Sequence, residues 1–186
     1  PELKYTLCNT KFGNLVLATD LIDQCSERWK TDLEKISEVN GNEIKDIVLE
    51  HPYLDRDSIL IHGEHVTTET GTGCVHTAPA HGIDDHNICK EYNIETIHAL
   101  DGNGFFNQEY KDLAGLPAIK ADQIVIDILK ESGTLINEED FHHSYPYCWR
   151  HKTPLIFAST PQWFISMDKS GLLEGSIQAI KDVNWE

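Results

Sequence analysis

The sequence lacks the features of a membrane protein and of a basic nucleic-acid binder. No apolar run in the 186 residues approaches the roughly 18–20 residues of a membrane-spanning helix, and no signal-peptide pattern opens the chain. Lysine and arginine are scarce, 15 against 31 aspartate and glutamate residues, which leaves a formal charge of −16. Because contacts to phosphates need clustered basic side chains, we expect no autonomous nucleic-acid binding. The chain begins at Pro1 without a methionine, so we expect it to be a piece of a longer protein.

Cysteine pairs and metal-ligand clusters are also missing. The five cysteines are odd in number and scattered (Cys8, Cys25, Cys74, Cys89 and Cys148), which favours reduced thiols and a cytoplasmic location. Cys148 and His151 form a C-x-x-H pair with metal-ligand spacing. Zinc takes four ligands, however, and no second pair of this kind occurs. We therefore expect no metal site within this chain.

The usual catalytic motifs are absent as well. There is no G-x-S-x-G nucleophile elbow, and no cysteine lies in a context that marks it as reactive. Gly71-Thr72-Gly73 lacks the lysine of a P-loop and the third glycine of a dinucleotide fingerprint. Its glycines permit either the close approach of a nucleotide or a tight connection between strands. Any hydrolysis by this chain is therefore expected to use a positioned water.

Short β-compatible runs dominate the chain. They predict a hairpin with a longer loop from residues 4–8 and 15–18, and further strands at 44–49, 58–61, 65–69, 74–77, 95–100 and 160–165. Helices are expected at 20–29 (capped by Thr19 or Asp20), 83–92, 119–132 and 170–180. Regular βαβ alternation is absent, so the pattern predicts a mainly β fold, a closed or strongly curved β-barrel with flanking helices.

The central helix at 83–92 contains one carboxylate that faces inward. At about 100° per residue, Asp85 lies near the middle of the apolar face formed by Ile88, Cys89 and Tyr92. Asp84 lies a quarter-turn away and Ile83 lies on the opposite side. An inward carboxylate in the first turn can serve the helix terminus, or it can face a ligand as an anion.

His76 precedes this helix, on the strand expected at 74–77. It shares a face with Cys74, because Val75 and Thr77 alternate with it. A strand histidine of this kind can be a satisfied core or surface residue, or a functional one.

The residues from Gly71 to Asp85 (GTGCVHTAPAHGIDD) resemble the active-site segment of the editing domain of class I aminoacyl-tRNA synthetases. That domain is the connective polypeptide inserted into the Rossmann catalytic domain of the isoleucyl, valyl and leucyl enzymes. The residues 143–154 (HSYPYCWRHKTP) and 160–164 (TPQWF) resemble the isoleucyl enzyme of the bacterial type. The resemblance implies an editing barrel at 1–140 and a return segment to the parent catalytic domain at 141–186.

The resemblance also implies roles for individual residues. Asp85 would anchor the α-ammonium of the mischarged amino acid, and His76 would line the side-chain pocket and exclude isoleucine. Substrate binding would involve a further set: Gly71, Thr72, Gly73, Thr77 and Gly82. The implied substrate is valine esterified to the acceptor end of isoleucine tRNA, hydrolysed by water without a cofactor in this chain. The parent enzyme would use ATP, magnesium and zinc, and the rest of it would hold the tRNA.

Two alternatives stay open beside this implied function. The chain could be a non-catalytic module that binds the acceptor end, or it could be a valyl or leucyl editing domain. The family also has a threonine-rich peptide that would precede Pro1, so the resemblance implies weak or absent deacylation by this chain alone. It further matches Cys148 and His151 to half of a zinc ribbon whose other pair lies before the insertion.

Overall fold

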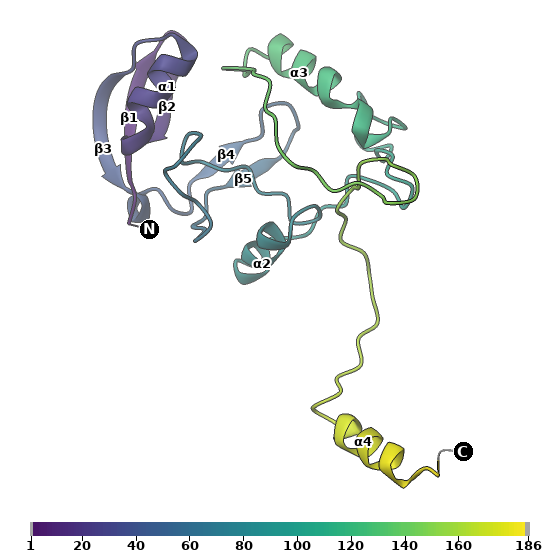
Figure 1. Ribbon diagram of the computed structural model, residues 1–186. Coiled ribbons are helices and arrows are strands. Elements are labelled where there is room, and N and C mark those ends of the chain that lie inside the picture. The colour runs from purple at the N-terminus through teal and green to yellow at the C-terminus, as the bar shows by residue number, and fades with distance from the viewer. Residues whose placement is uncertain (1, 185–186) are drawn as a thin grey trace.

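The computed structural model describes residues 2–184 and begins with the predicted hairpin (Figure 1). Strands β1 (Lys4–Thr10) and β2 (Gly13–Ala18) are antiparallel, and Thr10 pairs with Gly13. Only two residues, Lys11 and Phe12, separate the strands, so the prediction of a longer loop is wrong. Gly13 closes this tight turn with a φ of +101°, which favours glycine.

Strand β3 (Glu34–Asn40) pairs with the other edge of β1 and gives the sheet order β2-β1-β3. Sequence reasoning missed this strand. It lies at the sheet edge, and nearly all of its residues are exposed. Charged and polar residues are typical of edge strands, so the apolar alternation that predicts a half-buried strand is absent.

A helical segment follows β2 as predicted. It comprises the 3₁₀ turn η1 (Thr19–Leu21) and the helix α1 (Ile22–Trp29). The expected side-chain cap by Thr19 or Asp20 is wrong, because neither forms a capping hydrogen bond. The Thr19 hydroxyl instead lies 2.8 Å from the Thr6 hydroxyl of β1, so it links the helix start to the sheet.

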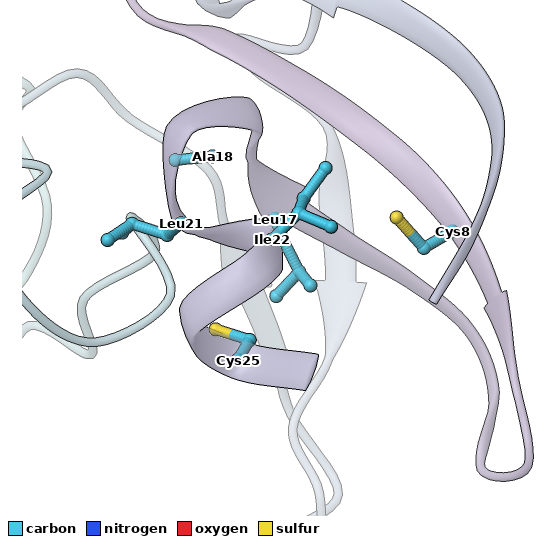
Figure 2. Close-up of a cluster of buried hydrophobic side chains, with 6 residues drawn as sticks. All are labelled: Cys8, Leu17, Ala18, Leu21, Ile22 and Cys25. Atoms are coloured by element: carbon cyan, nitrogen blue, oxygen red, sulfur yellow. The ribbon is translucent and has the colours of Figure 1, made fainter. Parts of the chain in front are cut away.

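The main core lies between this sheet and α1. Figure 2 shows its six side chains, which come from β1, β2, η1 and α1: Cys8, Leu17, Ala18, Leu21, Ile22 and Cys25. Each of them is at most 3 % exposed. The hydrophobic effect therefore stabilises the N-terminal part of the chain most strongly.

The predicted barrel is wrong. The short turn η2 (Gly41–Glu43) leads to a second sheet of two strands, β4 (Val48–Glu50) and β5 (Asp57–Ile59). Within residues 2–184 the sheets have three and two strands, and neither curls into a closed structure. The runs expected as strands at 65–69, 74–77, 95–100 and 160–165 form none, apart from the isolated bridge of Leu100 with Phe106. Without a pairing strand beside them, these runs cannot form a ladder.

The remaining predicted helices are confirmed. They are α2 (Ile83–Glu91), α3 (Asp122–Glu131) after the 3₁₀ turn η3 (Ala118–Lys120), and α4 (Leu172–Asp182). Figure 1 shows α4 apart from the other elements, at the end of an extended segment. In that segment Trp163 is 100 % exposed and Phe164 is 89 % exposed.

The chain exposes far more surface than a compact protein of its mass. Its accessible surface is 14347 Å², whereas a compact monomer of this mass exposes about 9,000 Å². No helix in the described range 2–184 is long and apolar enough to cross a membrane. Much of the apolar surface that a compact domain would bury is therefore uncovered.

Candidate functional site

The loop Gly71-Thr72-Gly73 is docked on the N-terminal sheet. The amide of Ala18 donates to the Thr72 carbonyl at 2.9 Å, and the Tyr5 hydroxyl donates to the Gly73 carbonyl at 2.8 Å. A Cβ at Gly73 would lie 2.4 Å from the Cβ of Ala18, and the φ of Gly73 is +76°. Glycine is therefore required here by a close approach between two protein segments. The geometry favours a tight connection for this loop.

Thr72 and Gly71 take part in the same connection. The Thr72 hydroxyl donates to the Cys74 carbonyl at 3.1 Å and accepts from the Cys74 amide at 3.2 Å. The Cys25 thiol of α1 lies 3.3 Å from the Gly71 carbonyl. Burial raises the pKa of the Cys25 thiol, so it stays protonated and can donate.

The segment that follows lines a large cavity. His76 is exposed and Thr77 is half-buried, and both lie on the cavity wall together with Gly73. The cavity has a volume of about 2150 Å³, and β4, β5 and residues 153–157 also line it. Pockets for small molecules usually measure about 300–1,000 Å³. The space can therefore admit a ligand much larger than one amino acid.

Asp85 faces inward from the first turn of α2, as its helical phase predicts. It is half-buried, whereas Asp84 is exposed and Ile83 is 72 % exposed. Its Oδ2 accepts the Ala78 amide at 3.1 Å, and no side-chain hydrogen bond caps α2. Its Oδ1 has no hydrogen-bond partner among residues 2–184. One carboxylate oxygen thus holds the preceding turn, and the other is available.

Gly82 makes room for this carboxylate. A Cβ at Gly82 would lie 2.7 Å from Asp85 Oδ2, and the backbone of Gly82 is extended, with a φ of −142°. The absence of a side chain, and not an unusual φ, is therefore the reason for glycine at this position.

The seven residues expected at the site do not converge on one cavity. Gly73, His76 and Thr77 line the large cavity, whereas Gly71 and Thr72 line a separate one of about 400 Å³. Gly82 and Asp85 line neither. The Asp85 carboxylate instead bonds to the backbone amide of Ala78, a residue that does line the large cavity.

The turn between Ala78 and Gly82 is also joined to the C-terminal return segment, a contact that sequence reasoning missed. The His81 Nδ1 lies 2.8 Å from the Phe157 carbonyl, and the Ser159 amide donates to the Ala80 carbonyl at 2.7 Å. Because a carbonyl only accepts, Nδ1 of His81 carries the hydrogen in this contact. Two hydrogen bonds therefore connect the candidate site to residues 157–159.

His51 and Arg56 are two further cavity residues that sequence reasoning missed. The His51 Nδ1 accepts the amides of Tyr53 at 3.3 Å and Leu54 at 3.1 Å. Burial lowers the pKa of His51, and the charges of Arg56 and His76 lower it further. His51 is therefore neutral, with its hydrogen on Nε2. In the sequence, His51-Pro52 and the charged residues 55–57 only separate the strands expected at 44–49 and 58–61.

Cys148 and His151 lie together on a tight turn. Their Sγ and Nδ1 atoms are 3.4 Å apart, and the His151 amide donates to the same sulfur at 3.5 Å. Across the described residues, no group of three or more histidine, cysteine or acidic side chains is placed to hold a metal ion. Two donors do not fill the four positions of zinc.

Comparison with curated proteins first identifies a class, the aminoacyl-tRNA synthetases. The chain is 44 % identical over 190 residues to the isoleucine–tRNA ligase of Idiomarina loihiensis, covering 98 % of this chain. It is 45 % identical to that of Coxiella burnetii (strain Dugway 5J108-111) and 43 % identical to that of Dichelobacter nodosus. The chain belongs to the isoleucine–tRNA ligase family. It spans 20 % of the length of these relatives. No family model matches the chain.

Proposed function

We propose that this chain is the editing domain of its parent synthetase, which removes valine wrongly attached to isoleucine tRNA. The parent would attach isoleucine to this tRNA with ATP, and the chain would act in the cytoplasm. The observation that carries the proposal is the half-buried Asp85 carboxylate, whose Oδ2 bonds to the amide of the cavity residue Ala78 and whose Oδ1 has no hydrogen-bond partner among residues 2–184. An ionised carboxylate in this position can bind the α-ammonium of an aminoacyl ester.

The chemistry of the two amino acids explains why a second site is needed. One methylene in an apolar pocket is worth only about 1–3 kcal/mol, a limit for which the choice between isoleucine and valine is the standard example. A site that admits valine and sterically rejects isoleucine adds a second selection. His76 would form the rejecting wall, and Asp85 would fix the ester so that a water attacks its carbonyl. Positioning of this kind supplies most of the rate enhancement, with a modest acid–base component.

The size of the cavity supports a contribution from the rest of the parent. A space of about 2150 Å³ is too wide to distinguish two side chains that differ by one methylene. A further wall from outside this chain would narrow it, and the uncovered apolar surface fits such a contact. We therefore expect the isolated chain to deacylate at least 100-fold more slowly than the parent. Equal rates would contradict this expectation.

The direct test is Asp85→Ala in the full-length synthetase, with release of valine from mischarged isoleucine tRNA as the measurement. We expect a loss of at least 100-fold, because charge-assisted anchoring and orientation both disappear. Unchanged release would refute the anchoring role. His76→Ala should in turn allow cleavage of isoleucyl-tRNA, and intact discrimination would make His76 a structural residue.

A second candidate function is a non-catalytic module that holds the acceptor end. It is favoured by the structural use of the glycine loop and of Asp85 Oδ2. Titration of the parent with a non-hydrolysable valyl-adenosine analogue separates the two functions. Binding that depends on Asp85 supports the editing pocket, and binding of bare tRNA that is independent of Asp85 supports the module. The isoleucine–tRNA ligase relatives speak against a valyl or leucyl domain.

A further inference from the structure

Arg56 has an incompletely satisfied guanidinium at the large cavity. Its Nε is buried and has no hydrogen-bond partner, the one such buried side-chain atom in the described part of the chain. No carboxylate within residues 2–184 lies within 4.0 Å of the guanidinium, although Asp55 and Asp57 flank it in sequence. Arg56 as a whole is half-buried, and a buried donor without a partner costs free energy that an anion from elsewhere can offset.

The neighbours of Arg56 on the cavity wall can also donate hydrogen bonds. His51 is held by the Tyr53 and Leu54 amides in the tautomer that carries its hydrogen on Nε2. His51, Arg56 and His76 all line the same cavity, and both Arg56 and His76 lie close enough to His51 to act on its charge. A guanidinium with an adjacent imidazole donor is a combination suited to an oxyanion with several acceptor oxygens.

We propose that Arg56 and His51 form a binding corner for a phosphate group, namely the phosphodiester that precedes the aminoacylated nucleoside of the tRNA. The proposal rests on the proposed function, since an ester bound along His76 and Thr77 brings this phosphodiester into the same cavity. The site formed by Arg56 and His51 lies among acidic residues. Glu50 and Asp57 line the cavity and repel an anion, so binding there depends on the fixed positive charge of Arg56.

The test uses the full-length synthetase and an acceptor-stem minihelix that ends in CCA and carries no amino acid. The minihelix carries either a natural 3′-terminal phosphodiester or a methylphosphonate, which has no charge. Its dissociation constant is measured against salt concentration for the wild type, Arg56→Gln, Arg56→Lys and His51→Asn. Arg28→Gln is the control, because it removes the same charge from α1, where the guanidinium pairs with Glu139.

We expect Arg56→Gln to weaken binding of the natural minihelix about tenfold or more at low salt. The slope of log K against log salt should fall by about 0.7, the value for one phosphate contact on a single strand. The methylphosphonate should cost the wild type the same factor and cost Arg56→Gln nothing further, because both changes remove one contact. Arg56→Lys should recover part of the affinity, His51→Asn should lose less than Arg56→Gln, and Arg28→Gln should bind like the wild type.

Three results would overturn the proposal. They are equal binding by Arg56→Gln and Arg28→Gln, additive losses from Arg56→Gln and the methylphosphonate, or a lower melting temperature of Arg56→Gln with unchanged minihelix affinity. The last would mean that a carboxylate elsewhere in the parent pairs with Arg56.

Competition by inorganic phosphate identifies the source of the anion. Suppose that phosphate competes in the wild type but not in Arg56→Gln, and that the methylphosphonate minihelix binds normally. The site would then hold a free phosphate, and the phosphodiester proposal would be wrong. Because the minihelix carries no amino acid, its binding is measured without hydrolysis. Failure of the phosphate site is therefore distinguishable from failure of the proposed editing function.

Discussion

Two regions of the molecule are stabilised by different interactions. One is the N-terminal sheet of β1, β2 and β3 together with α1, and the other is the turn between Ala78 and Gly82. The sheet and helix share a closely packed apolar core. The turn is held by hydrogen bonds: its Ala78 amide bonds to the Asp85 carboxylate, and its His81 ring and Ala80 carbonyl bond to the return segment. Packing is non-directional and tolerates no loss of volume, whereas a polar turn can present donors and acceptors to a ligand. The first region therefore contributes most of the packing, and the second carries the polar groups on which the proposed function rests.

The largest expected effect comes from truncating one isoleucine in each kind of environment. Ile22 is 3 % exposed in the core, and Ile165 is 78 % exposed in the extended segment before α4. Ile22→Ala should lower the free energy of unfolding by about 2–5 kcal/mol, and Ile165→Ala should change it by no more than about 0.5 kcal/mol. Urea denaturation of the chain measures both. Equal losses would mean that the extended segment is packed in solution.

The next effect tests the junction between the two regions. Gly71 and Gly73 both have a positive φ, +84° and +76°, but only Gly73 approaches Ala18. Gly71→Ala should cost about 1–2 kcal/mol from the backbone alone. Gly73→Ala should cost roughly 1–3 kcal/mol more, because its Cβ overlaps a buried alanine. Thermal unfolding compares the pair, and similar values would remove the close approach as the reason for Gly73.

A pH effect should distinguish His51 from the other histidines. The pKa of His51 is lowered in the folded state, so the unfolded chain binds the proton more readily. The contribution to stability is complete above the ordinary histidine pKa of about 6.5 and is lost as the pH falls through the lowered folded value. His51→Asn retains an acceptor for the Tyr53 and Leu54 amides but does not titrate. Its stability should vary less than that of the wild type below about pH 6.5.

Urea unfolding at several pH values measures this difference. His142→Asn is the control, because His142 is exposed, and the stability of this variant should follow pH as that of the wild type does. Parallel profiles for His51→Asn and the wild type would show that His51 does not carry the effect.

The smallest expected effect concerns the two hydrogen bonds between the turn and the return segment. His81→Ala removes the donor to the Phe157 carbonyl, a loss of about 1 kcal/mol of local stability. The Ser159 amide, which donates to the Ala80 carbonyl next to it, should then exchange its hydrogen about fivefold faster. His81→Asn places an amide donor near the position of Nδ1 and should restore protection. Unchanged exchange in His81→Ala would separate the two hydrogen bonds.

The same contrast explains what the sequence could predict. Helical phase correctly predicts Asp85 inside and Ile83 on the opposite, exposed side, because the period of a helix is a local property of consecutive residues. The hairpin of β1 and β2 is also local, and it is confirmed. The residues 74–77, expected as a strand, are of β-compatible types but have no partner strand. Strand pairing is a non-local property that the alternation of residues does not encode.

The roles of the candidate site residues stay a prediction, and the structure shows only where these residues lie. Gly73, His76 and Thr77 lie on one cavity, whereas the separate positions of Gly71 and Thr72 depend on docking to Ala18 and Cys25. His51 and Arg56 share the cavity with His76, and His81 contacts Phe157, so these placements depend on contacts between distant parts of the chain.

The central claim is that the charge of Asp85 acts on the substrate, beyond holding the turn. Asp85→Asn keeps a side-chain oxygen that can accept the Ala78 amide but carries no charge. The decisive measurement is the single-turnover rate of valine release from mischarged isoleucine tRNA by the full-length synthetase, with amide exchange at Ala78 as a check that the turn is intact. We expect Asp85→Asn to be about as slow as Asp85→Ala while Ala78 stays protected. Release at the wild-type rate by Asp85→Asn would contradict the claim and leave Asp85 with a structural role.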